Sequence, residues 1–320
     1  MVKPSKILLL VDGNNLFHRA YHALPPLTDR SGENANAVFG FSNMILKAIG
    51  EVKPDYIACA FDTKAPTFRH VEFEAYKAQR VAPPPDLYPQ LPKVKLVLEA
   101  FGVKYFELAG YEADDLLGTL AIQNLDKVER VIILSGDRDL LQLVDGKIKV
   151  QMPSFTKVSE GKPGWGLLMG SEEVKEKYGL EPHQMVDYKS LTGDPSDNVP
   201  GVSGIGPKTA ASLLQQYHTL ENLYDHLDEI AETTRTKLEK DRDVALSAKK
   251  LVQLDTNVDL RFTIDDLRFA PDWEKVRTSF EELGFKSIVS KLPGEKVQES
   301  KPSKDSKVEK KDDHAQLELI

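Results

Sequence analysis

Short apolar runs alternate with helical patterns through the first 150 residues of the chain. The runs contain branched or aromatic side chains and predict buried strands at residues 7–11, 56–61, 103–106 and 131–134. Between them the spacing of apolar positions predicts helices at residues 35–50, 87–101 and 113–125. This alternation predicts an α/β domain with a mainly parallel sheet and helices on both of its faces.

The pattern changes twice in the second half of the chain. From about residue 172 to residue 285 it is helical, with the glycine-rich interruption VPGVSGIGPKTA at residues 199–210. Residues 295–313 contain six lysines, six acids and almost nothing apolar, a composition typical of disorder. We therefore expect an α/β domain over residues 1–170, a helical domain over 171–292 and a disordered tail over 293–320.

Composition narrows the function classes. The 320 residues are 41% hydrophobic, and 42 Lys and Arg against 50 Asp and Glu give a net charge of −8, which excludes a wholly basic DNA-coating protein. The single cysteine, Cys59, excludes a disulfide framework and multi-cysteine metal sites, and its apolar neighbours predict a buried thiol. The first apolar run is too short for a signal peptide and no stretch reaches membrane-spanning length, so we expect a cytoplasmic protein without a membrane partner.

Acidic side chains follow three of the four predicted strands. Asp12 and Asp62 each come directly after a strand, and Asp137 follows the third through Ser135 and Gly136. Ligands of parallel sheets bind beyond the carboxyl ends of the strands. We therefore expect these carboxylates to converge at one edge of the sheet.

Further acids occur in three short motifs, EADD, GDRD and GDPSDN. With the strand-end residues they make nine carboxylates: Asp12, Asp62, Glu112, Asp114, Asp115, Asp137, Asp139, Asp194 and Asp197. Nine gathered carboxylates would resist full ionisation, and two Mg²⁺ or Mn²⁺ ions, which prefer oxygen ligands, would remove that difficulty. Each motif alone also fits a helix cap or a turn, but all of them in one chain predict a divalent-metal site. The HRAYH sequence lacks the glutamate of a zinc HExxH motif and is interpreted as an ordinary helical turn.

Two other segments suit a polyanionic ligand. TFRHVEFEAYKAQR, if helical, places Arg69, Tyr76 and Arg80 near one stripe beside Lys77, where cations can neutralise phosphates and a tyrosine can stack on a base; a solvated amphipathic helix is the alternative. GVSGIGPKT is not a P-loop, because Pro207 occupies the required lysine position. It fits a helix–hairpin–helix whose backbone approaches a phosphate, and its expected contacts are Gly201, Gly204, Gly206, Lys208 and Thr209.

Five motifs follow one another along the chain: VDGNNLFHRAYH, AFDTKAPTFRHVEFEAYKAQR, GYEADDLLGTLA, ILSGDRDLLQLV and LTGDPSDNVPGVSGIGPKTA. This ordered combination resembles the 5′-nuclease domain of bacterial DNA polymerase I and its stand-alone flap endonuclease relatives. The resemblance covers about residues 5–292. It implies a PIN-like/resolvase-like nuclease fold with a helical arch and a C-terminal H3TH domain. It also implies 5′→3′ exonuclease and 5′-flap cleavage of DNA, with hydrolysis of RNA primers, in replication and repair.

The resemblance also implies roles for individual residues. Asp12, Asp62, Glu112, Asp114, Asp115 and Asp137 would surround one Mg²⁺ or Mn²⁺ ion, and Asp139, Asp194 and Asp197 would lie nearer the second. Arg69, Lys77 and Arg80 would grip the scissile phosphate or the threaded strand, and Lys189 would contact the substrate. The glycine hairpin would bind duplex DNA, with K⁺ as a further cation.

The implied partners are DNA with 5′ flaps, nicks or 5′ ends, and the protein is expected to act as a monomer. The last residues, QLELI, resemble the short peptide that docks on bacterial sliding clamps, through Gln316, Leu317, Leu319 and Ile320; a random apolar terminus is the alternative. The chain is expected to lack polymerase activity because it stops where polymerase-fused relatives continue, and the glycine-rich segment 157–170 is expected to be a loop. Two other functions stay open: a catalytically silent, structure-specific DNA-binding protein and a PIN-type ribonuclease.

Overall fold

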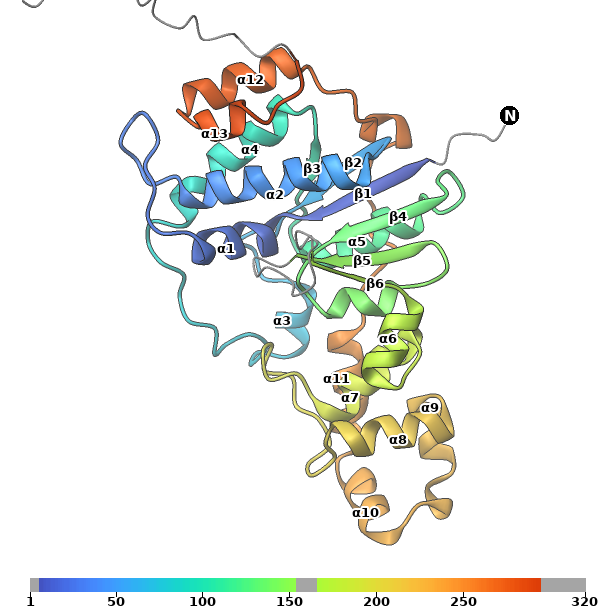
Figure 1. Ribbon diagram of the computed structural model, residues 1–320. Coiled ribbons are helices and arrows are strands. Elements are labelled where there is room, and N and C mark those ends of the chain that lie inside the picture. Colours follow the sequence, from blue (N-terminus) through green and yellow to red (C-terminus); the bar gives the residue numbers. More distant parts are fainter. Residues whose placement is uncertain (1–5, 154–165, 295–320) are drawn as a thin grey trace, which may run out of the picture.

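A six-stranded sheet forms the centre of the larger part of the molecule (Figure 1). In the computed structural model, which describes residues 6–153 and 166–294, its strand order is β3-β2-β1-β4-β5-β6. The strands are β1 (Ile7–Asp12), β2 (Tyr56–Ala60), β3 (Lys104–Phe106), β4 (Arg130–Leu134), β5 (Ile148–Met152) and β6 (Leu167–Met169). All neighbours pair in parallel except β5 and β6, which are antiparallel.

The central strand β1 shows why the sheet is covered on both faces. Leu9 and Val11 pack into one hydrophobic core, whereas Leu8 and Leu10 pack into the other. Successive side chains of a strand point to opposite faces, so a continuous apolar run requires an apolar layer on each side. The buried thiol predicted for Cys59 is confirmed, since β2 places it in the first of these cores.

Helices from both ends of the chain make the first covering layer. It contains α1 (Gly13–Ala23), α2 (Asn36–Val52), α4 (Leu91–Ala100), α12 (Trp273–Glu282) and α13 (Lys286–Val289). Figure 1 shows α12 and α13 beside α4 at the top of the molecule, and Val276 and Phe280 of α12 belong to the core of this layer. The end of the segment expected to form one helical domain over 171–292 thus returns to the sheet, because α12 has an apolar face that the sheet layer buries.

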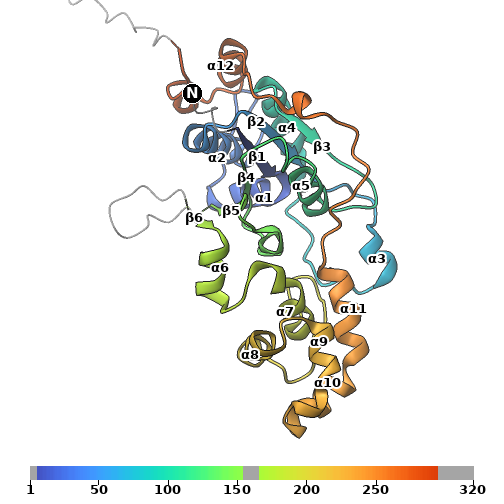
Figure 2. The same cartoon turned by 90° about the vertical axis from the view of Figure 1, so that its right-hand side faces the viewer.

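The second layer contains α5 (Ala113–Ile122), η2 (Asp139–Leu143) and η5 (Ile264–Leu267). Below it lie α6 (Ser171–Tyr178), η3 (Pro182–Gln184), α7 (Met185–Thr192), α8 (Pro207–Tyr217), α9 (Leu220–Asp225), η4 (Leu227–Glu229), α10 (Glu232–Lys240) and α11 (Arg242–Val252). Figure 2 shows that α11 runs beside α7 and leads back toward the sheet. A third hydrophobic core, which includes Leu191, Leu214 and Leu238, holds this helical region together.

The chain between β2 and α4 crosses the carboxyl edge of the sheet with little regular structure. It contains α3 (Phe68–Glu72) and η1 (Tyr88–Gln90), which are joined by turns and by an extended segment that includes three consecutive prolines, residues 83–85. Among the described helices, none is both long enough and apolar enough to cross a membrane. The tail residues Gln316, Leu317, Leu319 and Ile320 and most of the 157–170 segment lie outside the described residues. The loop expected for this segment is wrong at its described end, where β6 pairs with β5.

Candidate active site

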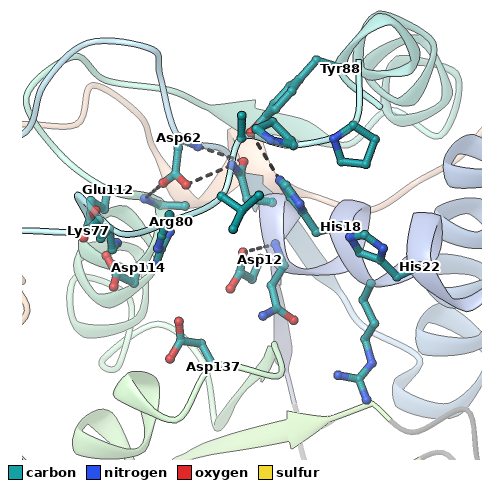
Figure 3. A pocket seen from close by; sticks show the side chains of 18 residues that line it. Asp12, His18, His22, Asp62, Lys77, Arg80, Tyr88, Glu112, Asp114 and Asp137 are labelled. Carbon is teal, nitrogen blue, oxygen red and sulfur yellow. Dashed lines mark hydrogen bonds and ion pairs between the residues drawn. The ribbon is translucent and has the colours of Figure 1, made fainter. Parts of the chain in front are cut away.

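A cavity of about 950 Å³ opens at the carboxyl ends of β1, β2 and β4. Five of the nine carboxylates expected from the sequence line it: Asp12, Asp62, Glu112, Asp114 and Asp137. Figure 3 shows Asp12, Asp62, Asp114 and Asp137 around a common space, with His18, His22 and Tyr88 on its other side. The convergence of strand-end acids on one edge of the sheet is therefore present in the fold.

The first two acids are held by the turns that follow their strands. Asp12 ends β1 and caps α1, accepting a hydrogen bond from the Asn15 amide at 3.0 Å and one from the Ser135 hydroxyl at 2.6 Å. Asp62 accepts hydrogen bonds from the Ala113 amide at 2.7 Å and from Asn14 Nδ2 at 2.9 Å. These contacts tie β1, β2, β4 and α5 together around the cavity.

The EADD motif forms the start of α5, and its three acids have different positions. Glu112 is the N-cap residue and Asp114 faces the cavity, but Asp115 is 0% exposed and does not line it. Its carboxylate accepts hydrogen bonds from the Glu112 amide at 3.1 Å and from the Asp255 amide at 2.9 Å. The carboxylate also forms an ion pair with a buried cation and does not line the cavity, and the role of Asp115 as a metal ligand stays a prediction.

The partner of Asp115 is Arg69, for which the sequence pattern favoured a contact with the substrate phosphate. Two guanidinium nitrogens reach the two Asp115 oxygens at 2.7 Å each. The same side chain donates to the carbonyls of Leu251 and Gln253 at 2.8 and 3.0 Å, and it is 1% exposed. The donors of Arg69 are thus turned inward to α5 and to the end of α11, and its contact with the substrate phosphate stays a prediction.

A second acidic cluster lies beside the first. Asp139, Asp194 and Asp197 each offer a carboxylate oxygen, and the three oxygens lie within 4.8 Å of one another. Asp139 starts η2, whereas Asp194 and Asp197 belong to a turn closed by paired backbone hydrogen bonds between Asp194 and Val199. Lys189 contacts Asp139 and lies 2.6 Å from Asp194.

The segment after α3 connects the two clusters. Tyr76 is 3% exposed and donates its hydroxyl to Glu112 at 2.9 Å and, alternatively, to Asp197 at 3.2 Å. Lys77 contacts Glu112 and lies 3.7 Å from Asp197, and Arg80 lies 2.6 Å from the same aspartate. The base-stacking role expected for Tyr76 does not fit a buried ring, whereas Lys77 and Arg80 do lie at the cavity.

The helical stripe expected to join Arg69, Tyr76 and Arg80 is absent, because α3 ends at Glu72. The Lys77 amide donates to the Asp197 carbonyl at 2.9 Å, and the Asn198 side chain donates to the Ala75 carbonyl at 2.7 Å. Lys77 adopts a left-handed φ of 54°, which is incompatible with a continuing helix. Docking on the 194–199 turn thus overrides the local helical pattern.

Burial and crowding of like charges raise the pKa values of four aspartates of the cavity, Asp12, Asp62, Asp114 and Asp137. Burial, opposed by the bonds from Ser135 and Asn15, raises the pKa of Asp12 to about 7. Burial and the neighbouring acids Asp115 and Glu112 raise the pKa of Asp114 well above its usual value. Burial likewise raises the pKa of Asp137. An all-oxygen donor set whose ionisation is disfavoured until a cation arrives fits hard divalent ions.

The glycine hairpin lies between α7 and α8. Pro207 occupies the first position of α8 with Gly206 as its N-cap residue, and Lys208, Thr209, Gly204 and Gly206 are exposed. Gly201 is different: a Cβ at this position would lie 2.2 Å from the Gly193 nitrogen, so this glycine permits packing against the preceding helix end. Its place among the phosphate contacts stays a prediction.

Several residues in or next to the cavity were not predicted from the sequence. Asn14, Asn15 and Ser135 contact the strand-end acids and orient them. The sequence signal for these three residues is their position close to the DG and GD pairs that follow the strands. His18 packs against Tyr88 with ring centroids 5.7 Å apart, and both line the cavity. The apolar residues 81–84 also line it, and a proline-rich sequence gives no indication of such a position.

Residues 7–179 match the family model described as 5′-3′ exonuclease, N-terminal resolvase-like domain. Residues 180–275 match the model described as 5′-3′ exonuclease, C-terminal SAM fold. The chain belongs to the 5′-3′ exonuclease family. The resemblance and the nuclease fold class inferred from the sequence motifs are confirmed by these matches.

Curated relatives of this family member include DNA polymerases I. The enzyme of Caldicellulosiruptor bescii is 42% identical over 289 residues, which cover 89% of this chain and 33% of the relative. The thermostable enzyme of Thermus thermophilus is 40% identical over 305 residues, covering 94% and 35%. The chain thus spans about a third of the length of these relatives.

Solved structures show the same fold at low identity. A T5 protein co-crystallised with metal ions superposes with a TM-score of 0.66 at 18% identity, over 89% of this chain and 100% of that one. The catalytic core of Rad2 in complex with DNA substrate superposes with a TM-score of 0.56 at 17% identity, over 90% and 92%. The resolvase-like sheet and the helical region are therefore shared across distant sequences.

Proposed function

We propose that this family member hydrolyses DNA phosphodiesters as a 5′→3′ exonuclease and structure-specific 5′-flap endonuclease, using two Mg²⁺ or Mn²⁺ ions. The observation that carries the proposal is the pair of adjoining carboxylate clusters, five acids around the cavity and three beside it. One structural neighbour is the bacteriophage T5 flap endonuclease in a pseudo-enzyme–product complex with DNA and metal ions, and its ligands fit this assignment.

The residues present suit two separate ions. Asp12, Asp62, Glu112, Asp114 and Asp137 would hold the first, and Asp139, Asp194 and Asp197 would hold the second. When bound, such ions polarise the phosphodiester, activate water and stabilise the leaving oxygen. Asp115 lies outside both sets because Arg69 occupies its carboxylate.

The chain's own cations complement the clusters. Lys77 and Arg80 lie at the boundary between them and can bind the non-bridging oxygens of a phosphate that reaches both. Exposed Lys208 and Thr209 at the start of α8, with the backbone amides beside Gly204 and Gly206, suit contacts to a duplex phosphate backbone without reading sequence. The proposal has four further parts. The hairpin binds a K⁺ ion, the enzyme also hydrolyses RNA primers, Lys189 contacts the substrate, and the enzyme acts as a monomer in the cytoplasm.

The test compares cleavage of a labelled 5′-flap DNA with Mg²⁺ and with EDTA. We expect cleavage with Mg²⁺, none with EDTA, and none with an Asp137→Asn variant that still binds the flap. Metal-independent binding without any cleavage would favour the silent DNA-binding alternative. Faster cleavage of an otherwise identical RNA flap would favour the ribonuclease.

A docking role for the tail is a separate proposal that depends on QLELI alone. Binding of a bacterial sliding clamp by the full chain should exceed that of a chain ending at Lys311. Equal affinity of the two chains would refute it.

A further inference from the structure

The second acidic cluster already contains a cation from the protein itself. Lys189 extends from the last turns of α7, and its side chain is 15% exposed. Its ammonium contacts Asp139 Oδ1 and lies 2.6 Å from Asp194 Oδ2, between two members of the three-acid cluster. A divalent ion bound by the same oxygens would have to take the place of this ammonium.

We propose that Lys189 is a built-in counter-cation of the second cluster, which stabilises the fold without metal and competes with the second ion. The inference rests on the proposed function, because it assumes that this cluster receives an ion. It assigns Lys189 a positioning role in the absence of metal, which is distinct from the substrate contact expected from the sequence.

The arrangement of charges around the cluster supports this role. Asp139, Asp194 and Asp197 come from two segments distant in sequence, so their mutual repulsion would separate η2 from the 194–199 turn. Lys189 contacts an acid on each of these two segments. Arg80 and Lys77 approach the third, Asp197, at 2.6 and 3.7 Å, and they come from the segment after α3. Lys189 is thus the described cation that holds the first two acids together.

A lysine suits an exchangeable counter-cation better than an arginine. Its ammonium is a compact point charge on a flexible stem, whereas a guanidinium binds carboxylates as a rigid fork. Arg69 shows the second kind of contact, with two 2.7 Å bonds to Asp115 and a side chain that is 1% exposed. Arg69 is therefore a permanent support of the fold, whereas Lys189 is a cation that metal can displace.

The experiment measures metal binding and stability without DNA, so that no activity is involved. Full-length wild type, Lys189→Met and Lys189→Arg are titrated with Mn²⁺ by isothermal calorimetry, and their melting temperatures are measured in EDTA and in saturating Mn²⁺. Lys175→Met is the matched control, because Lys175 forms a comparable pair with Glu181 at 2.6 Å on the exposed surface of α6.

We expect Lys189→Met to bind the second Mn²⁺ about tenfold more tightly than wild type, since no internal cation has to leave. In EDTA it should melt at a lower temperature than wild type, and Mn²⁺ should raise its melting temperature by more. Lys189→Arg should show neither the tighter binding nor the larger Mn²⁺ stabilisation. This variant also serves as the test if Lys189→Met fails to fold, because weaker binding of the second ion in Lys189→Arg than in wild type supports competition.

Two results would overturn the inference in distinguishable ways. The counter-cation role would be refuted if Lys189→Met binds two Mn²⁺ ions with unchanged or weaker affinity for the second. If Lys189→Met does not fold, unchanged affinity in Lys189→Arg would refute it. Either result would leave the nuclease proposal intact. Failure of wild type and of all the variants to bind Mn²⁺ would refute the two-ion function and this inference together.

Discussion

The ion pair between Arg69 and Asp115 predicts different roles for the adjacent aspartates of α5: Asp115 stabilises the fold and Asp114 binds metal. Replacing Asp115 by Asn keeps the shape of the side chain and removes its charge. The Arg69 guanidinium, 1% exposed, would then lose two charge-assisted bonds of 2.7 Å and keep, among the described residues, an ion pair with Glu112 at 3.4 Å. Removing one partner of a buried pair costs about 3–5 kcal/mol, because the other charge stays buried without compensation.

The assay is urea unfolding in EDTA, followed by circular dichroism, with Asp114→Asn as the matched control. We expect Asp115→Asn to lose about 3–5 kcal/mol and its midpoint to fall by about 1 M urea or more. Asp114 has a raised pKa because of burial and of its neighbours Asp115 and Glu112. Its replacement should therefore leave the free energy of unfolding unchanged or increase it, while Mn²⁺ binding is lost.

The opposite pattern would refute the reasoning. If Asp115→Asn unfolds at the wild-type urea concentration but no longer binds Mn²⁺, Asp115 is a metal ligand and its contact with Arg69 is incidental. An Arg69→Met variant gives an independent check, because it should destabilise the protein by a similar amount through the uncompensated Asp115 carboxylate. Wild-type stability of Arg69→Met would exclude the buried pair as a support of α5.

Three further predictions concern single side chains of the site. The pKa of Asp12 rises from 3.8 to about 7 on folding, so the folded state binds an extra proton between these values. In EDTA the free energy of unfolding should therefore fall as pH rises through that range, by up to about 4 kcal/mol from Asp12. Asp12→Asn should lower this slope and leave the part that comes from the raised pKa values of Asp62, Asp114 and Asp137, whereas an unchanged slope would exclude Asp12 as a source. Lys77→Ala should lower kcat for flap cleavage about 10²–10³-fold with a smaller change in KM, as measured by single-turnover and steady-state kinetics, and an unchanged kcat would place Lys77 outside the reaction. Lys208→Ala should weaken flap binding and lower the slope of log affinity against log salt by about 1 at an unchanged single-turnover rate, whereas an identical slope would leave Lys208 without a phosphate contact.

The strand-end acids could be predicted from the sequence because one physical rule covers them. A buried parallel strand is a continuous apolar run, and an acid directly after it must lie at the carboxyl edge of the sheet. Asp12, Asp62 and Asp137 satisfy this rule and line the same cavity. The strands β5 and β6 do not follow this rule: IKVQM alternates apolar and polar residues, a strand pattern that is not a continuous apolar run, and LLM is only three residues long.

The roles within EADD could not be predicted from spacing alone. Residues three apart on a helix share a face, so the spacing alone groups Glu112 with Asp115 and turns Asp114 aside. At the helix start, however, Glu112 is the N-cap with extended backbone, and Asp115 turns inward to Arg69 while Asp114 faces the cavity. The deciding partner comes from a segment 46 positions away, and helical periodicity contains no information about it.

The segment 73–80 shows the same limit and explains how the two clusters are joined. Its local pattern favours a helix, but hydrogen bonds to the 194–199 turn fix Lys77 in a left-handed conformation. A continuous helix would turn Tyr76 and Lys77 to different sides, whereas the observed backbone brings both to Glu112 and Asp197. The loss of helical hydrogen bonds is offset by these contacts, and the consequence is functional: cations lie between two groups of carboxylates that would otherwise repel each other. A site proposed to receive both metal ions and a phosphate needs such cations, and tertiary docking supplies them where the local sequence favours a helix.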